Sequence, residues 1–311
     1  MTKDKKGSVL IIALSILAIL AIFALGLGQR AALDLRLARY QRDSLKSFEL
    51  AKSGINRAII EIANDSTNDY DSLKDNWANN ETSAQEEFIY GIKDEEGKIN
   101  LNKCGLGQNE VKEILIYKGL PDAEAEEIRK ILSEWINSAV ESEPEKAVFK
   151  NEYLRQAEEF LLILEFYYKN KGVSGYEEEA RKLFDKIKDS VTVFGDGKVN
   201  INTCAESVLK SIARAAAKTK VISENYADSL ISQIIETRDS ASGPFKAQAE
   251  IDSFIPQKTE EQDIYDAIKP RLKIKSDFFR IEAGSHAGKT AKKIESVYDR
   301  SNNVIAYWHQ G

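Results

Sequence analysis

The sequence predicts an α+β protein in which a long N-terminal helix is followed by a small antiparallel sheet that a helical insertion interrupts. Three observations lead to this fold class. An uncharged run continues without a helix breaker into an amphipathic segment, one strand-like segment is separated from several others by a long helical stretch, and one motif occurs twice. With 311 residues, 42% of them apolar and 30% charged, the chain is long enough for about two domains with hydrophobic cores.

The N-terminal segment is the most apolar part of the chain. Residues 8–28 carry no charged side chain over 21 positions, and Lys3, Lys5 and Lys6 precede them. As a helix this run is about 32 Å long, which matches the hydrocarbon core of a bilayer. Because a helix that is apolar all round is rare in a soluble core, the run predicts a single membrane-spanning helix.

Residues 29–63 continue this helix as an amphipathic segment. Charged residues lie between apolar residues that recur mostly at helical spacings, namely Leu33, Leu37, Leu45, Phe48, Ile55, Ile59 and Ile62. The simplest interpretation is one helix of about 55 residues. Arginines follow the apolar run just as lysines precede it, so the distribution of positive charge does not decide the orientation in the membrane.

Residues 64–100 and 276–311 are predicted to form the sheet. The first of these segments begins with a polar, turn-rich loop, and a strand follows in which large side chains alternate at Phe88, Tyr90 and Ile92. Strand patterns return after the insertion, at residues 278–283, 293–299 and 303–308. We therefore expect a single sheet whose first strand precedes the insertion in the chain and whose other strands follow it.

The insertion at residues 101–275 is predicted to be helical and contains an internal repeat. The motif G-K-[IV]-N-[LI]-N-x-C begins at Gly97 and again at Gly197, and two helical patterns follow each copy. We therefore expect two related units, at about residues 97–190 and 197–275. In the second copy, Thr203-x-x-Glu206 matches a capping box and predicts the start of a helix. The pattern resembles a helix-hairpin-helix, or SAM-like, unit.

The start of the chain, residues 1–7, resembles a type IV prepilin leader. It is short and basic, and its final Gly7 is followed by Ser8 and the apolar run. The resemblance implies that a membrane-bound prepilin peptidase cuts between Gly7 and Ser8 and that Ser8 is then N-methylated. Most pilins carry a glutamate at the fifth mature position, where this chain has Ile12. A subunit without that carboxylate, which neutralises a neighbour's terminal amine in the filament, is better suited to a filament end than to its shaft.

The order of motifs along the chain resembles the type II secretion system protein K family, the large minor pseudopilins. The leader is followed by D-E-x-G-K-I-N-L-N, by V-T-V-F-G-D-G-K-V-N-I-N-T and by F-F-R-I-E-A, so the resemblance extends from Gly7 to Trp308. It implies a pilin-like arrangement, in which the N-terminal helix packs on the sheet, with a large helical insertion.

The same resemblance implies a function. Such a subunit would cap the tip of the inner-membrane pseudopilus together with other minor pseudopilins, and it would promote pilus assembly for protein export across the outer membrane. Its partners would be those minor pseudopilins, the major pseudopilin and the prepilin peptidase. The chain would cross the inner membrane once, with the soluble part in the periplasm. A minor tip pilin of a related type IV pilus is an alternative.

Calcium is a further possibility that the resemblance raises, because some members of the family bind it. The loop that begins at Asp196 starts like an EF-hand, but Ile201 stands where a glycine is required and Glu206 comes one position too early for the bidentate ligand. We therefore assign no calcium ligands and no other cofactor, and expect these acidic residues to be a solvated surface.

A membrane-anchored DNA-binding or DNA-uptake protein is a competing hypothesis, because helix-hairpin-helix units often bind phosphates through a glycine-containing hairpin. The hairpin should lie between Ser211 and Ala227, where this chain has no glycine. The formal net charge of −6 also speaks against a broad nucleic-acid-binding surface. We expect no nucleic-acid partner, and expect the helical units to bind other proteins.

Catalysis is not expected, and no catalytic residue is assigned. No motif places His286 or His309, the only histidines, beside Cys104 or Cys204. The cysteines are interpreted as small packed side chains, and a disulfide between them stays possible in an oxidising compartment. His286 is expected in a mobile turn between two strands and His309 in the C-terminal tail.

Overall fold

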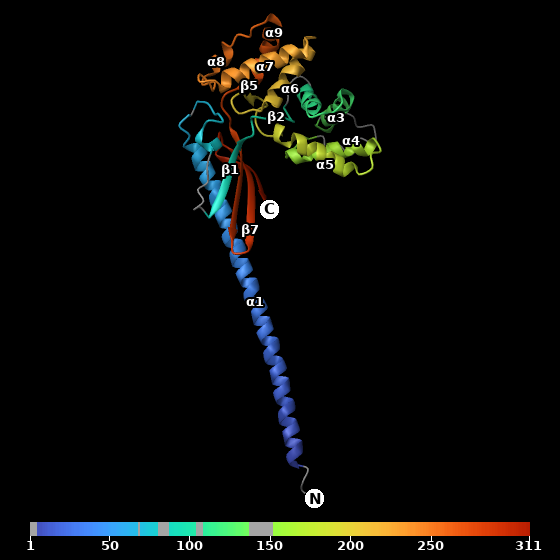
Figure 1. Cartoon of the computed structure of the whole chain (residues 1–311), viewed down its shortest axis with the longest axis vertical. Coiled ribbons are helices and arrows are strands. Elements are labelled where there is room, and N and C mark those ends of the chain that lie inside the picture. The colour runs from blue at the N-terminus through green and yellow to red at the C-terminus, as the bar shows by residue number, and fades with distance from the viewer. Residues whose placement is uncertain (1–4, 68, 80–86, 104–107, 137–151) are drawn as a thin grey trace.

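The computed structural model describes residues 5–67, 69–79, 87–103, 108–136 and 152–311. It shows a long helix whose C-terminal part lies along a sheet, with the helices of the insertion beyond the end of the sheet that is farther from the N-terminus (Figure 1). Two hydrophobic cores result. One lies between the long helix and the sheet, and the other lies within the insertion.

Helix α1 (Lys5–Ala63) is continuous over 59 residues, because neither proline nor a cluster of turn-forming residues interrupts it. Its C-terminal third places one apolar stripe on the sheet, made of the buried Ala51, Ile55, Ala58 and Ile62. Gly54 lets the two layers approach closely, since a Cβ atom there would lie 3.0 Å from the Cβ of Ala283.

The sheet is antiparallel with the order β1 (Phe88–Asp94), β6 (Phe278–Ala287), β7 (Thr290–Asp299) and β8 (Val304–Gln310). The first strand therefore pairs with the strand that follows the insertion. Phe279 lies at the centre of this core, where Trp77 of the short helix η1 (Asn76–Asn79) meets its ring edge-on with centroids 5.2 Å apart. The predicted fold class, a long N-terminal helix on a small antiparallel sheet with a helical insertion, is confirmed.

The insertion is built from two helical groups that share one core. The first group contains α2 (Asn109–Tyr117), α3 (Asp122–Ile136), η4 (Ala157–Glu159), α4 (Phe160–Asn170), α5 (Tyr176–Ile187) and η5 (Lys188–Ser190). The second contains α6 (Glu206–Thr219), α7 (Glu224–Asp239), α8 (Gln248–Asp252), α9 (Thr259–Ile268) and η6 (Lys269–Arg271). Helices α2 and α6, the first of each group, pack against each other and join the two groups.

The repeated motif forms the same small structure in both groups. Its first copy contains β2 (Ile99–Asn100), which pairs in parallel with β3 (Val191–Thr192). Its second contains β4 (Val199–Asn200), which pairs in parallel with β5 (Leu272–Lys273). Each motif strand thus pairs with the segment that follows the last helix of its own group. The repeat ties the beginning of each helical group to its end.

The second asparagine of each motif copy replaces a missing strand partner. Asn102 donates from its side-chain amide to the carbonyl of Leu154 and accepts from the Leu154 N–H, both at 2.8 Å. Asn202 does the same with Phe245, at 2.8 and 3.0 Å. A side-chain amide carries the same donor and acceptor as a peptide group. Each asparagine therefore satisfies the N–H and C=O groups of one residue, Leu154 or Phe245, that lies beside the motif without pairing in a sheet.

Several local predictions are wrong. Thr203 does not cap α6, whose N-cap is Ala205 with no side-chain hydrogen bond. The Thr203 hydroxyl instead donates to the buried carboxylate of Asp94 at 2.5 Å, which competes with capping. The stretch predicted as helical also contains β3, β4 and β5, whose two residues each are too few for a sequence period to reveal.

The histidine placements are also corrected. His286 lies within β6, and the turn to β7 contains Gly288, which has a φ of +58°. His309 lies within β8, paired with Glu295 of β7, and not in a tail. Both strands continue beyond their last large apolar side chain. The alternation of apolar residues therefore indicated strand ends that come too early in the chain.

Candidate functional site

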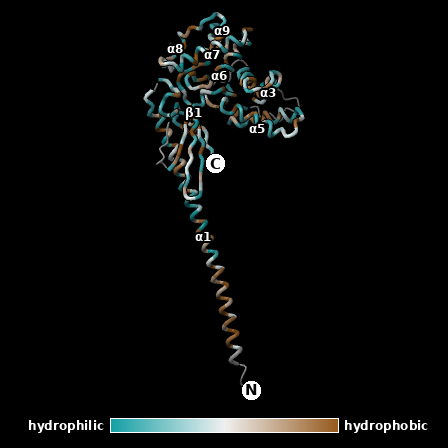
Figure 2. Tube along the Cα trace, viewed as in Figure 1, coloured by the Kyte–Doolittle hydropathy of each residue, from teal (hydrophilic) through white to brown (hydrophobic). Residues whose placement is uncertain are grey.

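The N-terminal part of α1 is an exposed apolar rod. The helix contains a window with a mean hydropathy of 3.0, and none of that window is buried in the protein. Figure 2 shows the apolar stretch along the part of α1 that extends beyond the sheet. The Ser15 hydroxyl donates to the Ile11 carbonyl at 2.9 Å, so this polar group is satisfied within the helix, as an apolar environment requires. The segment fits a single-pass membrane anchor.

The predicted processing site lies inside the first turns of this helix. Gly7 and Ser8 are both helical, Ser8 is exposed, and residues 1–4 of the predicted leader lie outside the described residues. Ile12, four positions after Ser8, is 56% exposed and lies one turn further along the same side of the helix. Cleavage after Gly7 and methylation of Ser8 remain predictions.

Between the apolar rod and the sheet, α1 keeps an apolar stripe without a sheet to cover it. Leu33, Leu37 and Tyr40 follow one another at helical spacing, and each is more than half exposed. Their positions continue the line that leads through Ser47 to Ala51, which faces the sheet. The same helical face therefore packs within the chain at one end and is open to other molecules at the other.

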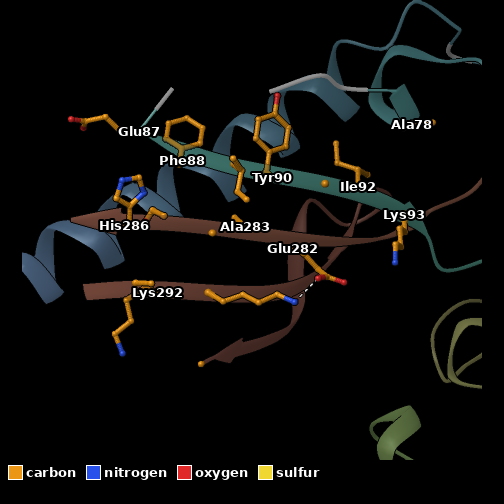
Figure 3. Close-up of a pocket in the computed structure, with 17 residues that line it drawn as sticks. Ala78, Glu87, Phe88, Tyr90, Ile92, Lys93, Glu282, Ala283, His286 and Lys292 are labelled. Carbon is orange, nitrogen blue, oxygen red and sulfur yellow. Dashed lines mark ion pairs between the residues drawn. The ribbon is translucent and has the colours of Figure 1, made fainter. Parts of the chain in front are cut away.

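The face of the sheet opposite α1 holds a groove with a volume of about 990 Å³ over β1, β6 and β7 (Figure 3). Gly91 and Gly284 leave its floor without side chains, and Ile89 stands beside them with 63% of its surface exposed. At its rim Glu282 and Lys293 form an ion pair at 2.5 Å. His286 lines this groove as well.

The exit of β1 toward the insertion carries three consecutive buried carboxylates, which the sequence analysis missed. Glu95 is fully buried and accepts from Lys98 of the motif at 2.5 Å and from Arg280 of β6 at 2.6 Å. Burial opposes its ionisation, but these two cations lower the pKa of Glu95 to about 2. Glu96 forms an ion pair with Lys273 of β5 at 2.6 Å.

Asp94 has hydroxyl and amide partners and, among the described residues, no direct ion pair. Its carboxylate accepts from Ser276 at 2.6 Å and from Thr203 at 2.5 Å, and Asn200 donates at 3.2 Å. Burial raises the pKa of Asp94 to about 6, and these hydrogen bonds offset only part of that effect. Because its partners come from the second motif and from the segment before β6, Asp94 joins the sheet to the insertion. In sequence these three acids resemble a solvated charged turn, so no pattern marked them.

A second acidic cluster lies beside the loop after α1. Carboxylate oxygens of Asp65, Asp71 and Asp75 lie within 4.8 Å of one another. Both oxygens of Asp71 accept from Arg300, at 2.9 and 2.7 Å, and those of Asp75 accept from Ser72. Calcium requires six to eight oxygen ligands, and here a guanidinium already supplies the positive charge. Arg300 therefore competes with any cation for Asp71, whereas one carboxylate oxygen of Asp65 has no hydrogen-bond partner among the described residues.

The loop that begins like an EF-hand also makes hydrogen bonds within the protein. Asp196 accepts from the backbone N–H of Lys198 at 2.9 Å and lies 3.4 Å from the ammonium of Lys273. The side-chain oxygen of Asn202 is occupied by the Phe245 N–H. One oxygen of Asp196 and the side-chain oxygen of Asn202 are thus already engaged within the protein.

In the hairpin between α6 and α7, acidic side chains neutralise the positive charge of a lysine. Lys218 lies 2.7 Å from Glu113 and 3.2 Å from Glu224. Where a phosphate-binding hairpin would carry glycine, Val221 has a φ of +59° and is 93% exposed. The hairpin thus adopts a left-handed conformation without the glycine that would let a phosphate approach its backbone closely.

Cys204 is buried and free, and burial raises the pKa of its thiol to about 12. At neutral pH it is therefore a thiol and not a nucleophilic thiolate. This agrees with its interpretation as a small packed side chain. Cys104 lies outside the described residues.

Comparisons with known proteins identify the fold. No protein-family model and no curated protein matches the chain. Among solved structures, a chain of "The Crystal Structure of the GspK-GspI-GspJ complex from enterotoxigenic Escherichia coli Type 2 Secretion System" matches with a TM-score of 0.63 and 15% sequence identity. The match covers 88% of this chain and 99% of that one, and so it includes both the sheet and the insertion. The chain therefore has a GspK-like fold, with a large helical insertion in a pilin-like α+β frame.

Proposed function

We propose that this protein is a minor pseudopilin of a type II secretion system, which caps the tip of the pseudopilus with other minor pseudopilins and promotes its assembly for protein export. The observation that carries this proposal is the match over 88% of the chain to a structure of a secretion-system complex. The resemblance of residues 1–7 to a prepilin leader is independent of that match and agrees with it.

The shape of the molecule supports a position at the tip. The insertion lies at the end of the sheet that is farther from the N-terminus, and its helices α3, α4 and α5 extend to one side of the axis of α1 (Figure 1). A shaft subunit needs a further subunit above it, and the insertion takes up that space. Ile12 removes the carboxylate with which most pilins neutralise a neighbour's terminal amine, and this loss is tolerated best at a filament end.

In this proposal α1 exchanges lipid for protein during assembly. The helix first crosses the inner membrane, with the sheet and the insertion in the periplasm, and then packs among the helices of the major and minor pseudopilins. Loss of lipid contact must be offset by close helix packing, which Ala18, Ala21, Ala24 and Gly26 allow. The role is structural, without catalysis.

The intact N-terminus tests entry into the pilin pathway. The full chain is extracted from membranes of cells with and without the prepilin peptidase, and its mass is measured. We expect a methylated chain that begins at Ser8 only when the peptidase is present. An uncut Met1 in both samples would contradict the proposal.

The alternative most similar to this proposal is a tip subunit of a type IV pilus, because type IV pili and type II secretion systems both use pilin-like subunits. A strain that lacks this chain distinguishes them. The secretion proposal predicts that exported proteins accumulate in the periplasm while surface pili persist. Loss of surface pili with unchanged secretion would favour the alternative.

A further inference from the structure

The two edges of the four-stranded sheet differ in chemistry. The β1 edge carries Glu87 and Lys93, and the short helix η1 packs against it. The β8 edge, with the sequence VIAYWHQ, contains no lysine, arginine, aspartate, glutamate or proline. Natural sheets protect exposed edges with such residues or with covering segments, because unpaired backbone groups otherwise pair with another strand. Among the described residues, the β1 edge has both charged side chains and a covering helix, whereas β8 contains none of these protective residue types.

The backbone of β8 is open at defined positions. The Gly311 N–H donates to the Lys293 carbonyl at 2.9 Å, which makes this pair a hydrogen-bonded one. Since hydrogen-bonded and open positions alternate along an antiparallel strand, the N–H and C=O groups of Trp308 and Gln310 point away from β7. Among the described residues, none donates to or accepts from these four groups.

The side chains of β8 leave apolar surface on both sides of this edge. Val304 is 50% exposed, Ile305 42% and Trp308 38%. Helix α1 makes its main contacts with β1, β6 and β7, so it does not cover the edge strand. A bulge near Val297 and Tyr298 interrupts the pairing of β8, and it leaves residues 307–310 in continuous register with β7.

The membrane anchor restricts which strand can pair there. The turn between β6 and β7 lies against Asp43 of α1, at the end of the sheet nearer the N-terminus. Strand β7 therefore runs away from the membrane and β8 runs toward it. Symmetric antiparallel pairing of β8 with β8 of a second copy would point the two α1 helices in opposite directions, which one membrane cannot accommodate.

We propose that the open edge of β8 binds an edge strand of a neighbouring pilin-like subunit, one that runs away from the membrane. Such a strand is antiparallel to β8 when both subunits are anchored alike, and in this fold the first sheet strand runs in that direction. The pairing adds a fifth strand through the backbone groups of Trp308 and Gln310, with apolar contacts to Ile305 and Trp308. This inference rests on the proposed function, and it assigns the surface through which the chain meets its minor-pseudopilin partner.

One-sided pairing also agrees with a terminal position. The β8 edge accepts a neighbour, whereas the charged and partly covered β1 edge does not offer an equivalent surface. Sheet extension from subunit to subunit therefore stops at this chain.

Backbone hydrogen exchange tests the pairing directly. The full chain is purified in detergent micelles, alone and together with the co-expressed minor pseudopilins of its own secretion system. We expect the Trp308 and Gln310 amides to exchange at least tenfold more slowly in the complex, while the His309 amide, already bonded to β7, changes little. A complex in which the Trp308 and Gln310 amides exchange as in the free chain would overturn the inference and leave the proposed function standing. Failure of the wild-type chain to form any such complex would overturn both.

A pair of variants at one position provides the second measurement. Gln310→Pro removes a backbone donor that has no partner among the described residues, whereas Gln310→Ala keeps the backbone N–H. We expect Gln310→Pro to reduce the partner retained in co-purification at least fivefold, with Gln310→Ala within twofold of the wild type. Equal retention by the two variants would contradict strand pairing. Circular dichroism and thermal unfolding check that both variants fold, and the exchange experiment on the wild type decides the question if Gln310→Pro does not.

Discussion

Asp94 and Glu95 are adjacent and both buried, yet their pKa values are shifted in opposite directions. The ordinary pKa of a free aspartate is near 3.8, and burial raises the pKa of Asp94 to about 6. For Glu95, Lys98 and Arg280 outweigh burial and lower the pKa to about 2. What separates the two residues is the presence of a directly bonded cation, because the effect of burial has the same sign for both.

The raised pKa of Asp94 predicts a pH dependence of stability. Between about pH 4 and pH 6 the folded chain binds more protons than the unfolded chain, so the contribution of Asp94 to the free energy of unfolding falls as pH rises through this window. We expect Asp94→Asn to remove this contribution and flatten the pH dependence between about pH 4 and pH 6 relative to the wild type. Chemical denaturation of the full chain in detergent at several pH values measures it. An unchanged slope would show that Asp94 does not titrate in this range.

Glu95 predicts the opposite sign. Its stabilising contribution is complete above pH 4.5 and is lost as pH falls toward 2. Glu95→Gln leaves Lys98 and Arg280 buried without their shared carboxylate, which should lower the free energy of unfolding at pH 7 by about 3 kcal/mol. Glu152→Gln, which breaks an exposed pair with Arg155, is the matched control and should cost less than about 0.5 kcal/mol. Equal costs for the two variants would contradict this account of the junction.

At the scale of elements, the repeated motif joins the beginning of each helical group to its end, and the helix–sheet contact joins α1 to the four-stranded sheet. Each motif copy closes its helical group with a two-residue parallel strand pair and one asparagine. The helix–sheet contact includes a close approach of the two layers at Gly54. Because each of these two contacts involves few residues, single substitutions can test them.

The asparagine prediction concerns Asn202, whose removal leaves the N–H and C=O groups of the buried Phe245 without partners. We expect Asn202→Ala to lower the free energy of unfolding by about 2 kcal/mol, and Asn102→Ala to have a similar effect in the first group. Gln248→Ala, on an exposed side chain, should change it by less than about 0.5 kcal/mol. Urea denaturation measures all three. If Asn202→Ala resembles the Gln248 control, the motif does not act as a backbone substitute.

The glycine prediction concerns the approach of α1 to the sheet. A side chain at Gly54 would press on Ala283 and on the ring of Phe88, which lie 3.0 and 3.1 Å from the position of its Cβ. Gly54→Leu should therefore destabilise the chain by about 2 kcal/mol, although leucine favours helix more than glycine does. Ser53→Leu places the same side chain on the exposed face of the same helix and should be nearly neutral. Thermal unfolding compares them, and a stabilised Gly54→Leu variant would be inconsistent with this contact.

For the whole molecule, the sequence predicts the helices and strands that have long periodic patterns of apolar residues. The helix from the apolar run to Ala63 and the strands at Phe88 and Phe278 follow from periods of 3.6 and 2 that extend over many residues. The two motif copies, which match in sequence, each form a two-residue parallel strand pair.

What the sequence did not predict depends on contacts between distant segments. Nothing local distinguishes Glu95, which meets Arg280 across the sheet, from a solvated acid in a charged turn. Thr203 matches a capping box until Asp94, more than one hundred residues earlier in the chain, takes its hydroxyl. The open edge of β8 likewise becomes visible only once strand order is known.

The measurement that tests the central claim most directly is the position of this chain on assembled pili. Pili are isolated from cells that overproduce the major pseudopilin, and gold label on an epitope in the insertion shows where the chain lies. The account predicts label at one end of each pilus only. Label distributed along the shaft would contradict a capping role.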